Sequence, residues 1–209
     1  MTDLFVDCIF QNIGSMIRFP MSRLLCDVER FRNPALEEMT KSGMWICYEK
    51  TSCGKMLKKL NEKHIQEMLF YYDLHHQMLE RKVAECLDRY GETLIIDAHS
   101  FPSKEQPYEL HKGTLRPDIC IGTDDFHTPE EMVDSLRNHF ESYNLSVGIN
   151  TPFCGTIVPL KYDHKNMHVR SVMIEINKSL YVNEETGLPK NLWIKNVIED
   201  YFRNLIIIK

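Results

Sequence analysis

The stretch GETLIIDAHSFP, from Gly91 to Pro102, decides the fold of this chain. Thr93 to Ile96 is a short apolar and partly β-branched run, which predicts a strand buried in a sheet. A polar cluster at 97–100 follows the run, and Pro102 then offers no N–H to a strand ladder. We therefore predict that a strand ends here and brings polar side chains to the carboxyl edge of a sheet, where open α/β folds bind their ligands.

Asp97 and His99 are the residues of this cluster that are best suited to chemistry. They are two positions apart, so in extended backbone both point to the same side of the strand. One interpretation is a functional group at the sheet edge. The other is a capped strand with a hydrogen-bonded histidine in the following turn, and the local sequence leaves both open.

Strands and helices alternate through the rest of the chain. From about Asn61 to Tyr90, apolar residues at steps of three and four predict a long amphipathic helix, with Gly91 as its C-terminal cap. Val169 to Asn177 alternates cleanly, which predicts a strand. Its predicted faces are Val172, Ile174 and Ile176 on one side, and Ser171, Met173, Glu175 and Asn177 on the other. The alternation of elements predicts an α/β fold with a mostly parallel or mixed sheet.

Local signals predict four further elements. Helical spacing predicts a helix from Asp3 to about Ile17, and a short apolar core among charges predicts a strand or strand-turn from Met21 to Phe31. Thr128 is the predicted N-cap of another helix, because proline and glutamate follow it. Pro189 opens a last predicted helix. We see no internal repeat or linker, so we expect a single domain over residues 1–209.

Composition and charge exclude several classes of protein. The chain has 209 residues, 43% of them hydrophobic and 26% charged, which is ordinary for a globular chain. The net charge is −5 without a concentrated basic stretch, so nucleic acid is not an expected partner. No apolar run reaches the ~20 residues of a membrane span, and the N-terminus lacks the layout of a signal peptide. The seven cysteines are scattered without a C-x-x-C, which predicts reduced residues in a cytoplasmic protein.

Glu175 and three arginines are further candidates for chemistry. A carboxylate within an apolar strand is costly to bury, so Glu175 is either in an ion pair or acts as a general base or metal-linked group. Arg23, Arg30 and Arg116 lie beside predicted strands and suit bidentate recognition of carboxylates. The alternative for Arg30 and Arg116 is an ion pair with a neighbouring acid, namely Asp27, Glu29 or Asp118.

Six motifs of this chain recur, in the same order, in N-formylglutamate amidohydrolases. They are SRLLCDVERF (Ser22 to Phe31), the His76 and Leu79 of HQML, LIIDAHSFP (Leu94 to Pro102), RPDICIGT (Arg116 to Thr123), NTPFCGTIVP (Asn150 to Pro159) and VMIEINKSLY (Val172 to Tyr181). The chain resembles this family from Met1 to about Glu184. The family is similar to zinc carboxypeptidases and to the succinylglutamate desuccinylase and aspartoacylase group.

The resemblance implies both a fold and an activity. The implied fold is a three-layer αβα domain with a mixed, mostly parallel central sheet, of the zinc-carboxypeptidase (phosphorylase/hydrolase-like) type. The implied activity is zinc-dependent hydrolysis of an N-acyl bond, here an N-formyl bond, on an acidic amino acid such as N-formyl-L-glutamate. The expected partner is therefore a small dicarboxylic substrate, and the expected cofactor is zinc.

The resemblance also implies roles for single residues at the metal. His99 of D-A-H-S resembles a zinc ligand, and Asp97 is expected to orient it. Glu175 of E-I-N resembles the general base that activates the attacking water. The acidic helix MTDLFVDCIF makes Asp3 a candidate metal ligand, with Asp7 behind it.

Substrate recognition is implied for a second group of residues. Arg23 and Arg30 match the S-R-x-x-x-D-x-x-R block of the family, and Arg116 matches its R-P-D block. These arginines are expected to bind the substrate carboxylates or the oxyanion, with Arg116 as a catalytic group. Asn150, in the N-T-P block, is a further candidate for substrate binding.

The chain departs from the family pattern in two places. Family members begin with a strand that ends in a P-H-S/A-G-like segment and brings another histidine to the metal, so we expect this first strand to be missing here. Glu29 stands where many relatives have Asn in D-L-N-R. Two alternatives stay open: a catalytically inactive or truncated family member that binds small carboxylates, and an amidase that uses Cys154 with His164 or His168.

Overall fold

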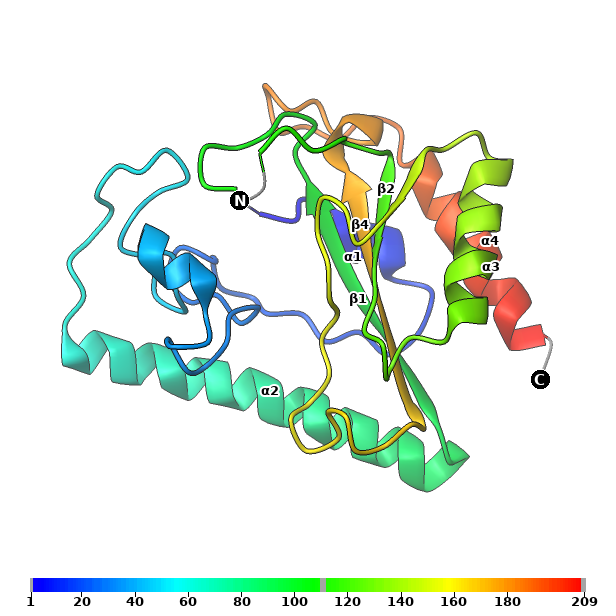
Figure 1. Ribbon diagram of the computed structural model, residues 1–209, viewed down its shortest axis with the longest axis horizontal. Coiled ribbons are helices and arrows are strands. Elements are labelled where there is room, and N and C mark those ends of the chain that lie inside the picture. The colour runs from blue at the N-terminus through cyan, green and yellow to red at the C-terminus, as the bar shows by residue number, and fades with distance from the viewer. Residues whose placement is uncertain (1, 110–111, 208–209) are drawn as a thin grey trace. The chain divides into compact units, whose positions relative to one another are not determined.

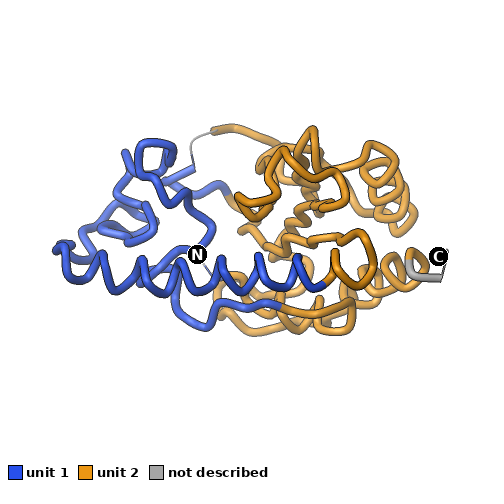
Figure 2. Tube along the Cα trace, turned by 90° about the horizontal axis from the view of Figure 1, so that it is seen from below, with its two compact units in different colours: residues 1–2, 17–85, 105–110 blue, residues 3–16, 86–104, 111–209 orange. Residues whose placement is uncertain are grey.

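A computed structural model describes residues 2–109 and 112–207 of the chain. The chain divides into two compact units, which Figure 2 shows in different colours. Unit 1 consists mainly of Ile17–Glu85, and unit 2 contains Asp3–Met16, Cys86–Lys104 and residues 112–207. The single domain expected from the sequence stays a prediction.

Unit 2 is built on a four-stranded sheet with the strand order β1-β4-β2-β3 (Figure 1). The strands are β1 (Thr93–Phe101), β2 (Ile119–Gly122), β3 (Val147–Ile149) and β4 (Val169–Asn177). β1 pairs with β4 in parallel and so does β2 with β3, whereas β2 and β4 are antiparallel. The sheet is mixed and mostly parallel, which confirms the predicted α/β class.

β4 has two chemically different faces, as its sequence alternation predicts. Ile174 and Ile176 are fully buried on one face, in the hydrophobic core. Glu175 points to the other face, where it pairs with Cys120 of β2 on one side and with His99 of β1 on the other. Because side chains alternate along a strand, the core lies on one side of the sheet and the polar groups lie on the other.

Three helices of unit 2 pack on the apolar face of the sheet (Figure 1). They are α1 (Val6–Phe10), α3 (Glu130–Ser142) and α4 (Trp193–Ile207). One hydrophobic core joins them to the strands, and each helix contributes fully buried residues to it, among them Ile9, Leu136 and Ile198.

The segment that follows β3 lies against the polar face of the sheet. The Sγ of Cys120 lies 3.2 Å from the carbonyl oxygen of Phe153. At Gly122 an added Cβ would collide with the carbonyl oxygen of Gly155, so only a hydrogen atom fits there. The close approach of this segment shields the polar face of the sheet from solvent.

Unit 1 contains one long helix and little other regular structure. The helix α2 (Glu62–Tyr90) matches the prediction of a helix from about Asn61, and its residues up to Glu85 belong to this unit. Cys26 and Ile46 pack against Met68 and Tyr72 of α2 in a small hydrophobic cluster. A 3-10 helix, η1 (Glu38–Ser42), also lies in unit 1. Within 2–109 and 112–207, no helix is long and apolar enough to cross a membrane.

Several predicted element boundaries are wrong. The strand predicted at Thr93 to Ile96 continues to Phe101, because β4 pairs with it residue by residue as far as Asn177. The segment 21–31, predicted as a strand or strand-turn, forms turns and contains no strand. The helix predicted from Asp3 is limited to Val6–Phe10, since Phe5 before it has a left-handed backbone with φ of 61°.

The two remaining helix starts also differ from the prediction. The N-cap of α3 is Pro129 and not Thr128. The Oγ1 of Thr128 instead donates to the carbonyl oxygen of Ser171, at 2.6 Å, which ties the start of α3 to β4. The helix predicted from Pro189 begins at Trp193.

Candidate active site

His99 lies between two carboxylates near the carboxyl end of β1. Its Nε2 is 2.8 Å from Oδ1 of Asp97, and its Nδ1 is 3.6 Å from Oδ2 of Asp3. The side chain of His99 is only 14% exposed, so these charges interact in a partly desolvated setting. The structure therefore brings together three residues that the sequence predicts to act at one site.

Asp97 is held by the backbone of the segment that covers the polar face. Its Oδ2 accepts a hydrogen bond of 3.0 Å from the N–H of Ile157, while its Oδ1 faces Nε2 of His99. An ionised carboxylate only accepts hydrogen bonds, so the ring proton of neutral His99 belongs on Nε2 and the lone pair on Nδ1. A carboxylate commonly fixes the tautomer and orientation of a metal-binding histidine in this way.

Asp3 is anchored through one oxygen and directs the other at His99. Its Oδ1 accepts hydrogen bonds from both the backbone N–H and the Oγ of Ser100, each at 2.9 Å. Its Oδ2 is the atom that faces Nδ1 of His99. Ser100 therefore sets the direction in which the Asp3 carboxylate points.

The donor atoms of Asp3 and His99 fit a metal ion. Two ligands at 2.0–2.1 Å from a tetrahedral zinc ion are about 3.3 Å apart, close to the 3.6 Å between Nδ1 of His99 and Oδ2 of Asp3. Imidazole and carboxylate are both ordinary zinc ligands.

Glu175 lies directly opposite His99 in the β1–β4 register, so both side chains are on the same face of the sheet. Glu175 is buried. Burial raises the pKa of the Cys120 thiol to about 11, and the neighbouring carboxylate of Glu175 adds to this effect. Cys120 is therefore a neutral thiol near pH 7 and is not an activated nucleophile.

Ser100 and Tyr181 are members of the site that sequence reasoning missed. Tyr181 follows β4 after the 3-10 helix η2 (Lys178–Leu180) and is fully buried. Burial raises the pKa of its hydroxyl, and the carboxylates of Asp3 and Glu175 raise it further, so the hydroxyl stays protonated. Ser100 is the last residue of the family motif D-A-H-S, and Tyr181 is the last residue of E-I-N-K-S-L-Y. Their place in these motifs was the sequence signal that could have identified them as site residues.

Arg116 is fixed near the carboxyl end of β1 by backbone and aromatic contacts. Its Nη2 donates to the carbonyl oxygens of Pro102 and Lys104, at 2.9 and 3.3 Å. Its guanidinium carbon lies 5.2 Å from the ring centroid of Phe101 and 5.7 Å from that of Phe153. The catalytic role of Arg116 stays a prediction.

Asn150 links the ends of β3 and β2. Its Oδ1 accepts a hydrogen bond of 2.9 Å from the N–H of Thr123, and its Nδ2 donates to Oγ1 of the same residue at 2.7 Å. Its backbone is left-handed, with φ of 52°, which asparagine tolerates better than most residues. These contacts stabilise the connection, and a role in substrate binding stays a prediction.

In unit 1, Asp27 gathers the two arginines of the S-R-x-x-x-D-x-x-R block. Its Oδ2 lies 3.3 Å from Nε of Arg23 and 3.2 Å from Nε of Arg30, and it accepts a hydrogen bond of 2.5 Å from the hydroxyl of Tyr48. Burial opposes the charge of Arg30, but Asp27 outweighs it and the pKa of Arg30 is raised. The predicted ion pair between Arg30 and Asp27 is confirmed, while substrate binding by either arginine stays a prediction.

His164, the partner considered for Cys154, is bound in a different cluster. Its Nε2 lies 3.1 Å from Oδ2 of Asp124, and its backbone N–H donates to Nε2 of His127 at 2.9 Å. The side chain of Cys154 is exposed. These contacts give no support to a catalytic pair between Cys154 and His164.

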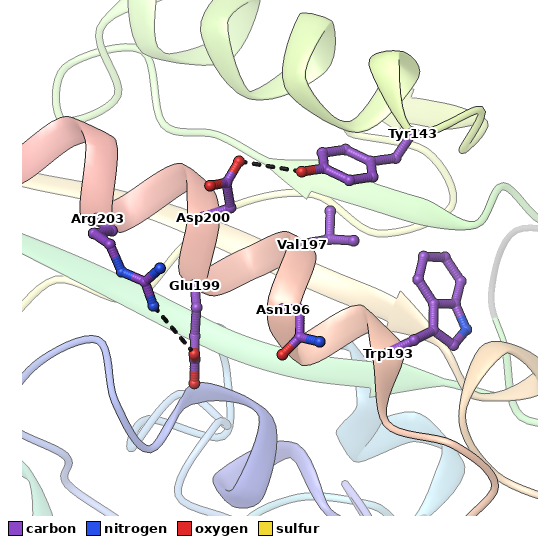
Figure 3. Close-up of a pocket in the computed structure, with 7 residues that line it drawn as sticks. All are labelled: Tyr143, Trp193, Asn196, Val197, Glu199, Asp200 and Arg203. Carbon is purple, nitrogen blue, oxygen red and sulfur yellow. Dashed lines mark hydrogen bonds and ion pairs between the residues drawn. The ribbon is translucent and has the colours of Figure 1, made fainter.

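A surface hollow on α4 contains none of the predicted site residues (Figure 3). In it, the hydroxyl of Tyr143 donates to Asp200 at 3.1 Å, and Arg203 lies 3.7 Å from Glu199. α4 packs on the apolar face of the sheet, opposite the face of His99 and Glu175. The hollow is therefore separate from the candidate active site.

The fold and this site define an α/β protein with an acid–histidine cluster at the carboxyl end of a strand in a mixed sheet. A model of the N-formylglutamate amidohydrolase family matches residues 1–182. The chain belongs to the N-formylglutamate amidohydrolase family, as its motifs predict.

Two solved structures share the fold. The chain is similar to N-formylglutamate amidohydrolase from Ralstonia eutropha JMP134, with a TM-score of 0.79 and 20% identity, over 97% of this chain and 81% of that one. It is also similar to a gene product from Agrobacterium tumefaciens, with a TM-score of 0.60 and 19% identity, over 90% of this chain and 68% of that one. No curated protein matches the chain.

Proposed function

We propose that this chain is a zinc-dependent amidohydrolase that removes the N-formyl group from an acidic amino acid such as N-formyl-L-glutamate, releasing formate and glutamate. Membership of the amidohydrolase family supports the reaction class. The main support for metal dependence is His99, whose Nε2 is held by Asp97 and whose Nδ1 faces Asp3.

Asp3 and His99 are the proposed metal ligands, and Asp97 keeps the ring of His99 in the ligating tautomer. Zinc, when bound, lowers the pKa of water to near 7 and polarises a carbonyl group. Ser100 keeps the carboxylate of Asp3 directed at the site through its two hydrogen bonds.

Glu175 is the proposed general base. It takes a proton from water as the water oxygen adds to the formyl carbon, and it gives this proton to the amine as the C–N bond breaks. Its position opposite His99 on the same face of the sheet supports this role. Arg116 is the proposed group for the developing oxyanion, since its guanidinium is held near the carboxyl end of β1.

Arg23 and Arg30 are the proposed groups that bind the carboxylates of the substrate. Asp27 fixes both side chains, so less conformational entropy is lost when a ligand binds. Local positive charge is needed here because the chain as a whole has a net charge of −5. We propose a cytoplasmic location as well, on the basis of the scattered cysteines of the sequence.

Metal content and formate release test the proposal together. The purified protein should contain zinc and release formate from N-formylglutamate, and chelation should remove both until zinc is restored. Turnover that survives chelation but is lost on thiol alkylation would contradict the zinc mechanism and favour Cys154. A protein without metal and without turnover, even after zinc is supplied, would instead be the carboxylate-binding member of the family.

A further inference from the structure

The outer side of α2 has an exposed apolar stripe within unit 1. Phe70, Leu74 and Met78 are 63%, 46% and 41% exposed, and they lie four residues apart, one above the other on the helix. Tyr71 beside them is 41% exposed, and its ring packs edge-on against Phe70 with centroids 5.5 Å apart. Aligned large apolar side chains on a surface usually mark an interaction site.

Charged residues extend this stripe at both ends with mirrored spacing. Lys63 and Glu67 precede the apolar residues, and Arg81 and Glu85 follow them. Counted from Leu74, the seven residues lie at −11, −7, −4, 0, +4, +7 and +11, and all seven are exposed. Steps of three and four keep these seven residues on one side of the helix, as in a coiled coil, and we call this row of seven residues the seam.

We propose that two copies of this chain associate through this seam as an antiparallel helix pair, with the two-fold axis at Leu74. Antiparallel pairing about Leu74 puts each residue opposite the one at the same distance on the other side. Phe70 then meets the partner's Met78, and Leu74 meets the partner's Leu74. The apolar centre supplies the affinity, since burial of apolar surface is the main driving force for association.

The charges select this orientation. In the antiparallel pair, Glu67 faces the partner's Arg81, and Lys63 faces the partner's Glu85. Each attraction occurs twice, because a two-fold interface is self-complementary. A parallel pair in register would instead place every charge opposite its own copy, which is repulsive. Charge pairs on a surface are individually weak, so they fix the register more than they add affinity.

The neighbours of the seam are compatible with this arrangement. Gln66 faces the partner's Lys82, and Tyr71 faces the partner's Gln77, so no like charges meet there. Glu85 already pairs with Lys82 of its own helix, with Nζ and Oε2 2.7 Å apart. The seam spans about 33 Å from Lys63 to Glu85, at 1.5 Å per residue, which is long enough for a helix pair.

Sedimentation of the full chain over about a hundredfold range of concentration tests the proposal, because association depends on concentration. The wild type should pass from monomer to dimer. Leu74→Glu should stay monomeric over the whole range, since it places two carboxylates at the axis. Leu160→Glu, which makes the same change at another exposed leucine, should dimerise like the wild type. Formate release and helix content confirm that each variant is folded.

Exchanging the charges of Glu67 and Arg81 tests whether these residues meet across the interface and whether the two helices are antiparallel. Glu67→Arg alone and Arg81→Glu alone should each raise the dissociation constant about tenfold, which corresponds to 1.4 kcal/mol. The double variant recreates the attraction with reversed signs, so its dissociation constant should return toward that of the wild type. A wild type that stays monomeric at the highest concentration, a Leu74→Glu variant that still dimerises, or a double variant weaker than both single variants would overturn the proposal.

Discussion

His99 can bind a metal only through the ring nitrogen that carries no proton. Asp97 assigns the proton to Nε2, because its ionised carboxylate only accepts hydrogen bonds, and Nδ1 is then available on the side of Asp3. The position of one proton on His99 therefore depends on the charge of Asp97. Ile157, by donating to the other oxygen of Asp97, keeps the carboxylate in the orientation that this requires.

Asp97→Asn should weaken zinc binding although it changes the shape of the side chain very little. The amide oxygen would accept from Ile157, so the amide NH₂ would face Nε2 of His99 and force the ring proton onto Nδ1. Loss of such an orienting group costs about 10–100-fold in metal affinity. Zinc titration of the metal-free protein measures the effect, and an unchanged affinity would show that Asp97 does not set the tautomer.

Glu175→Gln should lower kcat for formate release about 10²–10⁴-fold, the usual contribution of a general base. Glutamine has the same size but takes no proton, so the KM and the zinc content should change little. Single-turnover kinetics with metal analysis of the same sample make the measurement. A loss of zinc with the activity would instead identify Glu175 as a ligand.

A residue of this site could be predicted from the sequence only where its residue type is unusual at its position in the predicted strand. Glu175 was found because a carboxylate within an apolar strand is unusual, and His99 was found because a polar cluster follows an apolar run. Ser100 and Tyr181 were missed because a serine at the end of a strand and a tyrosine after one are common. Their roles depend on Asp3, which is 97 positions from Ser100 in the sequence.

The elements of unit 2 hold the site by close approach of backbones as well as by side chains. Gly122 of β2 lies under the segment after β3, which also contains the N–H of Ile157 that binds Asp97. A larger residue in β2 would therefore displace the N–H group that orients the carboxylate of Asp97.

Gly122→Ala should lower the free energy of unfolding by about 1–3 kcal/mol, the usual cost of overpacking. The added methyl group would collide with the carbonyl oxygen of Gly155 and with Met173, and the segment would have to move. Thermal or denaturant unfolding measures the change. Gly14→Ala is the matched control, because at that position a Cβ meets no heavy atom of the described residues within 4 Å.

α2 makes the stability of unit 1 depend on pH through His75. Burial, and next the charge of His76, lower the pKa of His75 from its ordinary 6.5. The unfolded chain then binds more protons below pH 6.5, so stability is lost as the pH falls through this region, by up to about 1.4 kcal/mol per pH unit. His75→Gln should reduce this loss in unfolding curves taken at falling pH, whereas His168→Gln, at an exposed position, should keep it.

Elements that are held by contacts with residues far away in the sequence were predicted less accurately than elements defined by their own pattern. β4 was predicted with its correct bounds because its alternation is a property of the strand alone. β1 was predicted too short, since Asp97 and Ser100 look like the end of a strand but find partners in Ile157 and Asp3. The segment 21–31 was predicted as a strand or strand-turn, and its strand part is wrong because Asp27 holds the segment in turns through contacts that an apolar pattern does not reveal.

Across the whole molecule, a metal bound only by the folded state should raise the stability of the protein. Zinc at about 100 times its dissociation constant adds about 2.7 kcal/mol to the free energy of unfolding. Differential scanning calorimetry with and without zinc should show a higher Tm with the metal. His99→Asn should abolish the increase, and an equal increase in this variant would mean that zinc binds elsewhere.

The two faces of β4 restrict how this family can change by insertion and deletion. One residue added inside β4 would exchange the faces of every position after it, so that a carboxylate would enter the core and an isoleucine would replace it beside His99. Two added residues would keep the faces but move Glu175 one pair away from His99. Related genes should therefore vary in length in the segments around β4, while the number of codons from Val169 to Glu175 stays constant.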